Sequence, residues 1–254
     1  MIKFGLLRSK FITNPWSMIV KLQCCPNCSS TNIVKNGRTV YGAQRCLCHD
    51  CGKTRVIERK IRQDKTELIQ RSFLERLSLR GICRVFRISL TTLYFLLELE
   101  TQRLPDFRQS VEAAQPGDIL EFDELCGFVG RRTNKRWLWV ALNRRNRQVV
   151  AYVIGDRSSN TFKRLIRKVP VEYLACQSFS DLWKSYRILK SKGNHKLVTK
   201  DSGETNHIER WNCTLRQRVS RYVRKSLAFS KIDKFHHLMT KLFIFDYNLK
   251  IINT

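Results

Sequence analysis

Acidic residues are scarce in this chain. Of its 254 residues, 21 are Asp or Glu and 48 are Lys or Arg, so the formal net charge is +27 at pH 7. A compact fold holds such an excess poorly unless a polyanion neutralises it, and we therefore expect a nucleic acid as the partner. Composition leaves one alternative open, a passively basic protein such as a ribosomal protein.

Long apolar runs are also lacking. No stretch approaches the ~20 consecutive apolar residues that span a bilayer, and the apolar run near the first residue is too short for a signal peptide. We therefore expect no membrane partner and a cytoplasmic location. In a reducing compartment, the ten cysteines are metal ligands or free thiols rather than disulfides.

Four of the cysteines form two pairs with two-residue spacers, Cys25 with Cys28 and Cys48 with Cys51. The 19 residues between the pairs fit the spacing of a four-cysteine zinc site, which needs four thiolates in a tetrahedron. Residues 22–60 lack the apolar surface for a core of their own, so we expect metal to hold this module. The alternatives are a disulfide cluster or unligated thiols.

Helical periodicity begins at residue 64 and continues to about residue 100. Ser89 is a candidate cap between two of the helices, and this arrangement is typical of a helix-turn-helix. The second helix would then lie in the major groove and present Thr91, Thr92 and Tyr94 to DNA. An ordinary helical hairpin fits the spacing equally well.

Residues 118–250 predict a mixed α/β layer in which three strands are followed by alternating helices and strands. The expected strands are Asp118–Val129, Arg136–Asn143, Gln148–Gly155, Val171–Phe179 and His195–Thr199. The expected helices are Asn160–Lys168, Leu182–Leu189, Glu204–Lys225 and Lys231–Tyr247. In the N-terminal module we expect short β-prone pieces at Thr39–Tyr41 and Thr54–Ile57.

Three carboxylates stand out in this layer. Asp123 lies within an apolar strand, on the face opposite Leu120 and Phe122, where a carboxylate is costly unless it is paired or binds metal. Asp181 ends the next strong apolar run, and Glu209 adjoins the apolar stripe of a helix. Three such side chains could hold two Mg²⁺ ions about 4 Å apart. Surface or capping roles are the alternative, and the competing acidic residues are Glu121, Glu124, Asp156, Asp201 and Glu204.

Basic residues cluster on both sides of these carboxylates, in residues 131–147 and 206–241. We interpret the two runs as phosphate-binding flanks, with Arg210, Arg216 and Arg221 as candidate DNA contacts. The alternative is a solvated helix face.

Four stretches of the sequence together resemble the transposases of the insertion-sequence-1 type. They are Cys25–Cys28 with Cys48–Gly52, Leu77–Arg84, Asp123–Trp139, and Ile208–Trp211 with the residues up to Arg216. The resemblance covers about residues 22–245. It implies an N-terminal zinc-binding motif, a helix-turn-helix and an Asp-Asp-Glu catalytic domain with an RNase H-like fold. By the same resemblance, Asp123, Asp181 and Glu209 are the catalytic carboxylates, with Mg²⁺ or Mn²⁺ as their cofactor.

We therefore expect an N-terminal extension (1–21), a zinc-ribbon-like module (22–60), a helix-turn-helix (61–104) and an RNase H-like α/β catalytic domain (117–254). The expected function is that of a DNA transposase, which binds double-stranded DNA as a homo-oligomer in the prokaryotic nucleoid. It cleaves transposon ends and joins them to target DNA. Two alternatives remain open: a DNA-binding regulator without catalytic activity, and a nuclease of the same fold.

Overall fold

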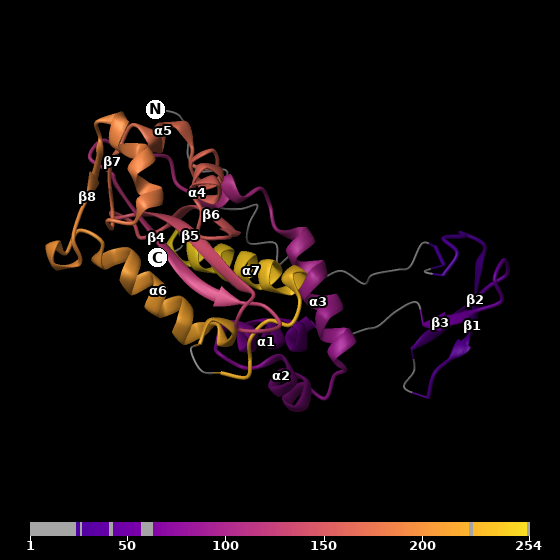
Figure 1. Cartoon of the computed structure of the whole chain (residues 1–254). Helices are drawn as coiled ribbons and strands as arrows, with labels where there is room; N and C mark the ends of the chain where they lie inside the picture. Colours follow the sequence, from indigo (N-terminus) through magenta and orange to yellow (C-terminus); the bar gives the residue numbers. More distant parts are fainter. Residues whose placement is uncertain (1–23, 26, 41–42, 57–62, 224–225, 253–254) are drawn as a thin grey trace. The chain divides into compact units, whose positions relative to one another are not determined.

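The structure, a computed structural model, describes residues 24–25, 27–40, 43–56, 63–223 and 226–252 (Figure 1). The predicted extension over residues 1–21 lies outside the described residues. The chain divides into two compact units, Met1–Ile69 and Gln70–Thr254. The second unit contains the predicted helix-turn-helix together with the larger sheet.

The first unit contains a three-stranded antiparallel sheet in the order β1-β2-β3. The strands are β1 (Ile33–Arg38), β2 (Gln44–Cys48) and β3 (Thr54–Val56), and helix α1 (Gln63–Leu74) follows them. The β-prone piece predicted at Thr39–Tyr41 is not a strand at residues 39 and 40, because β1 ends at Arg38, and Tyr41 lies outside the described residues. Most side chains of β1 are exposed, so the strand lacks the alternation of polar and apolar residues that would have revealed it.

Two helices of the second unit follow α1, and both start at a serine cap. They are α2 (Leu79–Phe86) and α3 (Leu90–Arg103), joined by a turn in which Arg87 adopts a left-handed conformation with φ 52°. The Ser89 hydroxyl accepts a hydrogen bond from the Thr92 backbone N–H at 3.0 Å, as the capping prediction requires. Two serine-capped helices joined by a turn are therefore present, whereas their assignment as a DNA-binding helix-turn-helix stays a prediction.

The larger sheet has five strands in the order β6-β5-β4-β7-β8, with β4 at its centre (Figure 1). Strands β4, β5 and β6 are antiparallel neighbours, whereas β7 runs parallel to β4, and β8 parallel to β7. This mixed α/β sheet confirms the predicted fold class. The strands are β4 (Ile119–Phe128), β5 (Lys135–Asn143), β6 (Val149–Gly155), β7 (Gln177–Ser180) and β8 (His195–Leu197).

Helices cover both faces of this sheet. On one face, Phe122 and Trp139 pack edge-on or tilted against Phe162 of α4, and Tyr186 closes the same aromatic core. On the other face lie α6 and α7, so Asp123 faces away from Phe122 as alternation predicted. The helical segments are η1 (Phe107–Ser110), α4 (Ser159–Ile166), α5 (Val171–Leu174), η2 (Lys184–Lys192), η3 (Lys200–Ser202), α6 (Asn206–Arg218), η4 (Ser220–Tyr222) and α7 (Asp233–Ile252).

Two predicted elements differ from the structure. The expected strand Val171–Phe179 is a short helix, α5, followed by the four-residue strand β7. The spacing of its apolar residues does not distinguish a helix from a strand. Tertiary packing decides between the two, because the Tyr173 ring fills the core. The expected long helix Glu204–Lys225 ends at Arg218, where the β-branched Val219 adopts an extended conformation.

Candidate active site and metal centre

The four cysteines of the predicted zinc module lie together. Their sulfur atoms all lie within 4.8 Å of one another. The Cys25 and Cys51 sulfurs are 3.6 Å apart, and those of Cys28 and Cys48 are 3.5 Å apart. A tetrahedral site with Zn–S bonds of about 2.3 Å requires sulfur–sulfur separations of roughly 3.8 Å, so the quartet has the shape of a zinc site.

The local backbone prepares these thiols for a cation. The backbone N–H groups of Asn27 and Cys28 lower the pKa of Cys25 to about 6, which favours its thiolate. For Cys28, the Ser30 N–H lowers the pKa, but burial and the neighbouring thiols raise it further, to about 12. A metal ion would remove this competition, because it stabilises all four thiolates together.

Asp123 and Asp181 are brought together by the parallel pairing of β4 with β7. Phe122 is the register partner of Ser180, so Asp123 and Asp181 follow as the next residues on neighbouring strands. Adjacent strands lie about 4.8 Å apart, and residues in register point to the same face. Asp181 is fixed in this position because its Oδ1 accepts a hydrogen bond from the Trp183 N–H at 2.9 Å.

Glu209 is positioned through Glu121, which anchors helix α6 to strand β4. The buried carboxylate of Glu121 accepts hydrogen bonds from the backbone N–H groups of His207 at 3.1 Å and Ile208 at 3.0 Å. The N-cap residue Thr205 makes no side-chain capping bond, so Glu121 satisfies these first-turn donors in its place. This attachment fixes the start of the helix on β4 one residue before Glu209, which is exposed.

The electrostatics of Asp123 reflect its burial and the acidic residues around it. Burial raises the pKa of Asp123 to about 7, and the negative charges of Glu124, Asp181 and Glu209 contribute to the rise. The carboxylate oxygens do not form a cluster as tight as the cysteines: within the described part of the chain, the four cysteines are the group whose ligand atoms all lie within 4.8 Å. Asp123 and Asp181 are half-buried and Glu209 is exposed, and carboxylate oxygens are ligands that Mg²⁺ and Mn²⁺ prefer.

Two residues of this site were not predicted as functional. Asn212 is 6% exposed and donates a hydrogen bond from Nδ2 to Asp123 Oδ2 at 2.7 Å, while its buried Oδ1 has no hydrogen-bond partner among the described residues. Helical spacing could have revealed it, since Asn212 follows Glu209 by three residues and lies on the same side of α6. Strand alternation could have revealed Glu121, which precedes Asp123 by two residues.

Glu124, one of the acidic residues that competed with the three carboxylates in the sequence, is buried beside the site. Its carboxylate accepts hydrogen bonds from Arg157 Nε at 2.8 Å and from the Tyr186 hydroxyl at 2.5 Å. The Arg157 guanidinium in turn lies over the Trp183 ring, 3.7 Å from its centroid. Glu124 therefore belongs to a structural network and is not a neutral surface position.

The predicted DNA-reading residues lie at the start of α3, in different surroundings. Thr91 is exposed, and the Thr92 hydroxyl bonds to Ser89 at 2.8 Å. The Tyr94 ring stacks on Phe235 of α7 at 3.9 Å, so this ring contributes to the fold.

The predicted phosphate contacts also differ in exposure. Arg210 is exposed beside Glu209, and Arg216 is half-buried on the same helix. Arg221 is half-buried, burial lowers its pKa, and it donates a hydrogen bond to the Phe229 carbonyl at 3.2 Å. The Arg221 guanidinium is thus largely taken up by the fold, whereas Arg210 faces solvent.

Among the described residues, no helix has the length and apolar character needed to cross a membrane.

Comparison with known proteins identifies the family of the larger unit. The IS1 transposase family model matches residues 119–248, which span β4 to α7. The insertion element IS1 4 protein InsB of Escherichia coli (strain K12) is 38% identical over 127 residues, covering 48% of this chain and 73% of that protein. The insertion element iso-IS1n protein InsB of Shigella dysenteriae is 36% identical over 129 residues, covering 50% and 93%.

The comparison with solved structures gives a match with a TM-score of 0.38 and 12% identity. The matched structure is the cryo-EM structure of a simian T-cell lymphotropic virus intasome in complex with PP2A regulatory subunit B56 gamma. The match covers 70% of this chain and 66% of that chain, a level of similarity from which nothing follows for function. The family model, in contrast, matches more than half of the sequence and includes the strand of Asp123 and the helix of Glu209. The chain therefore belongs to the IS1 transposase family.

Proposed function

We propose that this chain is a DNA transposase that cleaves the strand at each end of its element and joins the freed 3′-OH to target DNA. The observation that supports the proposal is the parallel register of β4 and β7, which brings Asp123 and Asp181 to neighbouring positions, together with the attachment of the first turn of α6, the helix of Glu209, to β4. Membership of the IS1 transposase family supports the same class of reaction.

Asp123, Asp181 and Glu209 would hold Mg²⁺ or Mn²⁺, which when bound supplies Lewis-acid stabilisation of the attacking and leaving oxygens. The chain itself supplies fixed ligands. The Asp123 carboxylate is oriented by the Asn212 amide and by the Glu124 backbone N–H at 2.8 Å. Ligands that are already oriented lose little freedom when the substrate arrives.

The two reactions share one phosphoryl-transfer geometry. In the first, a water oxygen attacks the scissile phosphorus and the P–O3′ bond breaks, leaving a 3′-OH and a 5′-phosphate. In the second, this 3′-OH attacks a phosphorus of the target, so one phosphodiester bond forms as another breaks. No external energy source is needed for joining. Exposed cations next to the carboxylates, such as Arg210, would neutralise the approaching phosphates.

End recognition is assigned to the N-terminal part of the chain. A zinc ion on Cys25, Cys28, Cys48 and Cys51 would fix the small sheet. The start of α3, with Thr91 and Thr92, would contact base edges. Because a transposon has two ends, we expect the active form to be a homo-oligomer on double-stranded DNA, in the prokaryotic nucleoid.

The test is an in vitro reaction of the full chain with a labelled duplex that carries the terminal repeat of its element, a plasmid target and Mg²⁺ or Mn²⁺. The proposal predicts a labelled end joined to the plasmid, and no product when the divalent cation is omitted. Binding without cleavage would instead indicate a regulator. Cleavage without joining would indicate a nuclease.

A further inference from the structure

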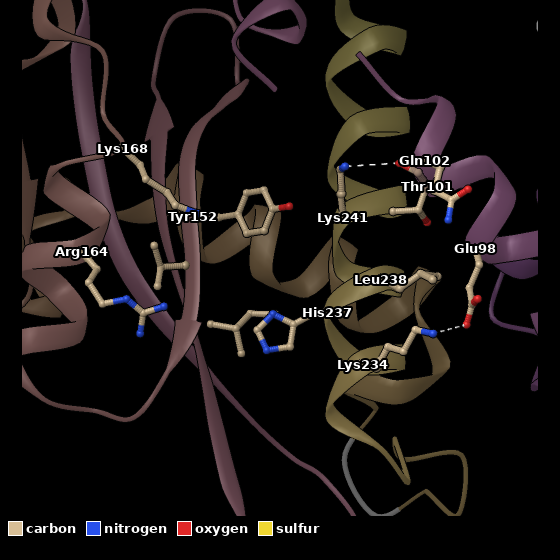
Figure 2. Close-up of a pocket in the computed structure, with 12 residues that line it drawn as sticks. Glu98, Thr101, Gln102, Tyr152, Arg164, Lys168, Lys234, His237, Leu238 and Lys241 are labelled. Atoms are coloured by element: carbon tan, nitrogen blue, oxygen red, sulfur yellow. Dashed lines mark hydrogen bonds and ion pairs between the residues drawn. The ribbon is translucent and has the colours of Figure 1, made fainter. Parts of the chain in front are cut away.

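A second basic site lies at the edge of the larger sheet, away from the proposed catalytic carboxylates. It is a pocket of about 430 Å³ between β6, α3, α4 and α7. Four of its lining residues are Lys or Arg, and one is a carboxylate; we call this site the edge pocket and define it by Arg164, Lys168, Lys234, Lys241, Glu98 and Tyr152. Figure 2 shows Tyr152 between Lys168 and Lys241.

The charges in the edge pocket are incompletely compensated. Lys234 pairs with the single carboxylate, Glu98, at 2.7 Å, and Lys241 donates to the Thr101 carbonyl at 3.3 Å (Figure 2). Among the described residues, no acidic partner lies within ion-pair distance of Arg164 or Lys168. Burial, followed by the charge of Arg164, lowers the pKa of Lys168. A bound anion would relieve this repulsion between like charges.

The position of the edge pocket relates it to the proposed active site. Tyr152 on β6 pairs with Val140 on β5, which pairs with Asp123 on β4. These three residues form one row across the sheet, so two strand spacings of about 4.8 Å separate the strand of Tyr152 from that of Asp123. In the described part of the chain, no strand pairs with the outer edge of β6.

We infer that the edge pocket binds the phosphodiester backbone of DNA at a point separate from the site of strand cleavage. A polyanion fits better than a second copy of the chain, because a second copy carries the same net charge of +27. The DNA is either the transposon end or the target duplex, and the two share this backbone chemistry. The inference rests on the proposed function only in taking DNA as the ligand.

The test compares two double variants with matched charge changes. Arg164→Gln with Lys168→Gln removes two cations from the edge pocket. Lys163→Gln with Arg167→Gln removes two cations that are exposed, as Arg164 and Lys168 are, and that have the same four-residue spacing, but neither lines the pocket. Fluorescence anisotropy measures binding of the full-length proteins to labelled duplexes over a salt series, without Mg²⁺ or Mn²⁺.

Each neutralised phosphate contributes about 0.9 to the slope of log K against log salt. The pocket variant should therefore lose between about one and two units of slope, and the control variant clearly less. An equal change in both variants, or a wild-type slope in the pocket variant, would overturn the inference. Loss on the end duplex alone assigns the pocket to the transposon end, whereas equal loss on a duplex of unrelated sequence assigns it to DNA in general.

This measurement does not depend on catalysis. If the two variants differ in DNA binding as expected but the wild-type chain joins no ends, the proposed function is contradicted. The inference about the edge pocket is then unaffected. A wild-type chain that joins ends, combined with a pocket variant of unchanged slope, would contradict the edge pocket alone.

Discussion

At the scale of single residues, the candidate active site depends on more than its three carboxylates. The Asn212 amide holds Asp123 through one atom, and its other polar atom is buried with no hydrogen-bond partner in the described part of the chain. A buried unsatisfied carbonyl is costly, and such groups are found where a site awaits a ligand or water. Asn212 is therefore a positioning residue for Asp123.

Replacing Asn212 with Ala should lower the rate of end cleavage by about 10–100-fold, because residues that orient metal ligands have effects of this size. The concentration of Mg²⁺ needed for half-maximal rate should rise, while DNA affinity stays unchanged. Gln217→Ala, at an exposed position of the same helix, is the control and should change neither quantity. An Asn212→Ala variant with a wild-type Mg²⁺ dependence would assign this residue to packing alone.

At the scale of elements, one buried carboxylate fixes a whole helix. Glu121 binds the first turn of α6 and also pairs with Arg144 at 2.7 Å. The Arg144 guanidinium reaches Glu204 as well, at 2.8 Å. The position of Glu209 thus depends on a contact between β4 and the start of α6.

Glu121→Ala should reduce the free energy of unfolding by about 3–5 kcal/mol, because it leaves Arg144 without its buried partner and α6 without its cap. Urea denaturation measures this loss. Glu204→Ala removes the more exposed partner of the same arginine and should cost less than about 1 kcal/mol. Equal losses in the two variants would show that Glu121 does not anchor the helix.

Helix α3 carries a pH-dependent element of stability. Burial raises the pKa of Glu100 to about 7, and the charge and hydrogen bond of Arg103 offset part of this rise. Because the folded-state pKa lies above the unfolded one, the contribution of Glu100 to stability is fully present below about pH 4.5 and is lost as the pH rises through 7. Glu100→Gln should match wild type at pH 4.5 and exceed it by up to about 3 kcal/mol at pH 8, at 1.36 kcal/mol per pKa unit. A pH-independent difference in urea denaturation would contradict this assignment.

The sequence predicted those elements whose pattern depends on local chemistry. Ser89 and the cysteine spacers have local signals, and the strand of Asp123 alternates clearly. The elements predicted wrongly depend on distant contacts. Tyr173 is drawn into a core built from other strands, and the attachment of α6 to β4 depends on Glu121. Neither contact can be inferred from neighbouring residues, whereas the three-residue spacing from Glu209 could have indicated Asn212.

At the scale of the whole molecule, two units rely on different sources of stability. The larger unit has an extended apolar core, whereas the first holds its small sheet beside four converging cysteines. Metal should therefore be essential to the first unit and dispensable for the folding of the second.

Cys48→Ser should lose the single zinc ion and specific end binding, while the unit Gln70–Thr254 still unfolds cooperatively. Native mass spectrometry measures the zinc stoichiometry, and thermal denaturation follows the larger unit. Cys24→Ser is the matched control, since Cys24 adjoins the quartet without belonging to it. Retention of stoichiometric zinc by Cys48→Ser would refute the four-cysteine site.

The central claim, that Asp123, Asp181 and Glu209 form one catalytic unit, is tested most directly at the second carboxylate. The measurement is strand transfer of a labelled transposon end by Asp181→Asn and by Asp201→Asn, with DNA binding measured in parallel. Asp181 continues the strand register beside Asp123, whereas Asp201 is exposed in η3. We predict that Asp181→Asn binds the end normally but forms no joined product, and that Asp201→Asn joins at the wild-type rate. Joining by Asp181→Asn together with its loss in Asp201→Asn would contradict the account.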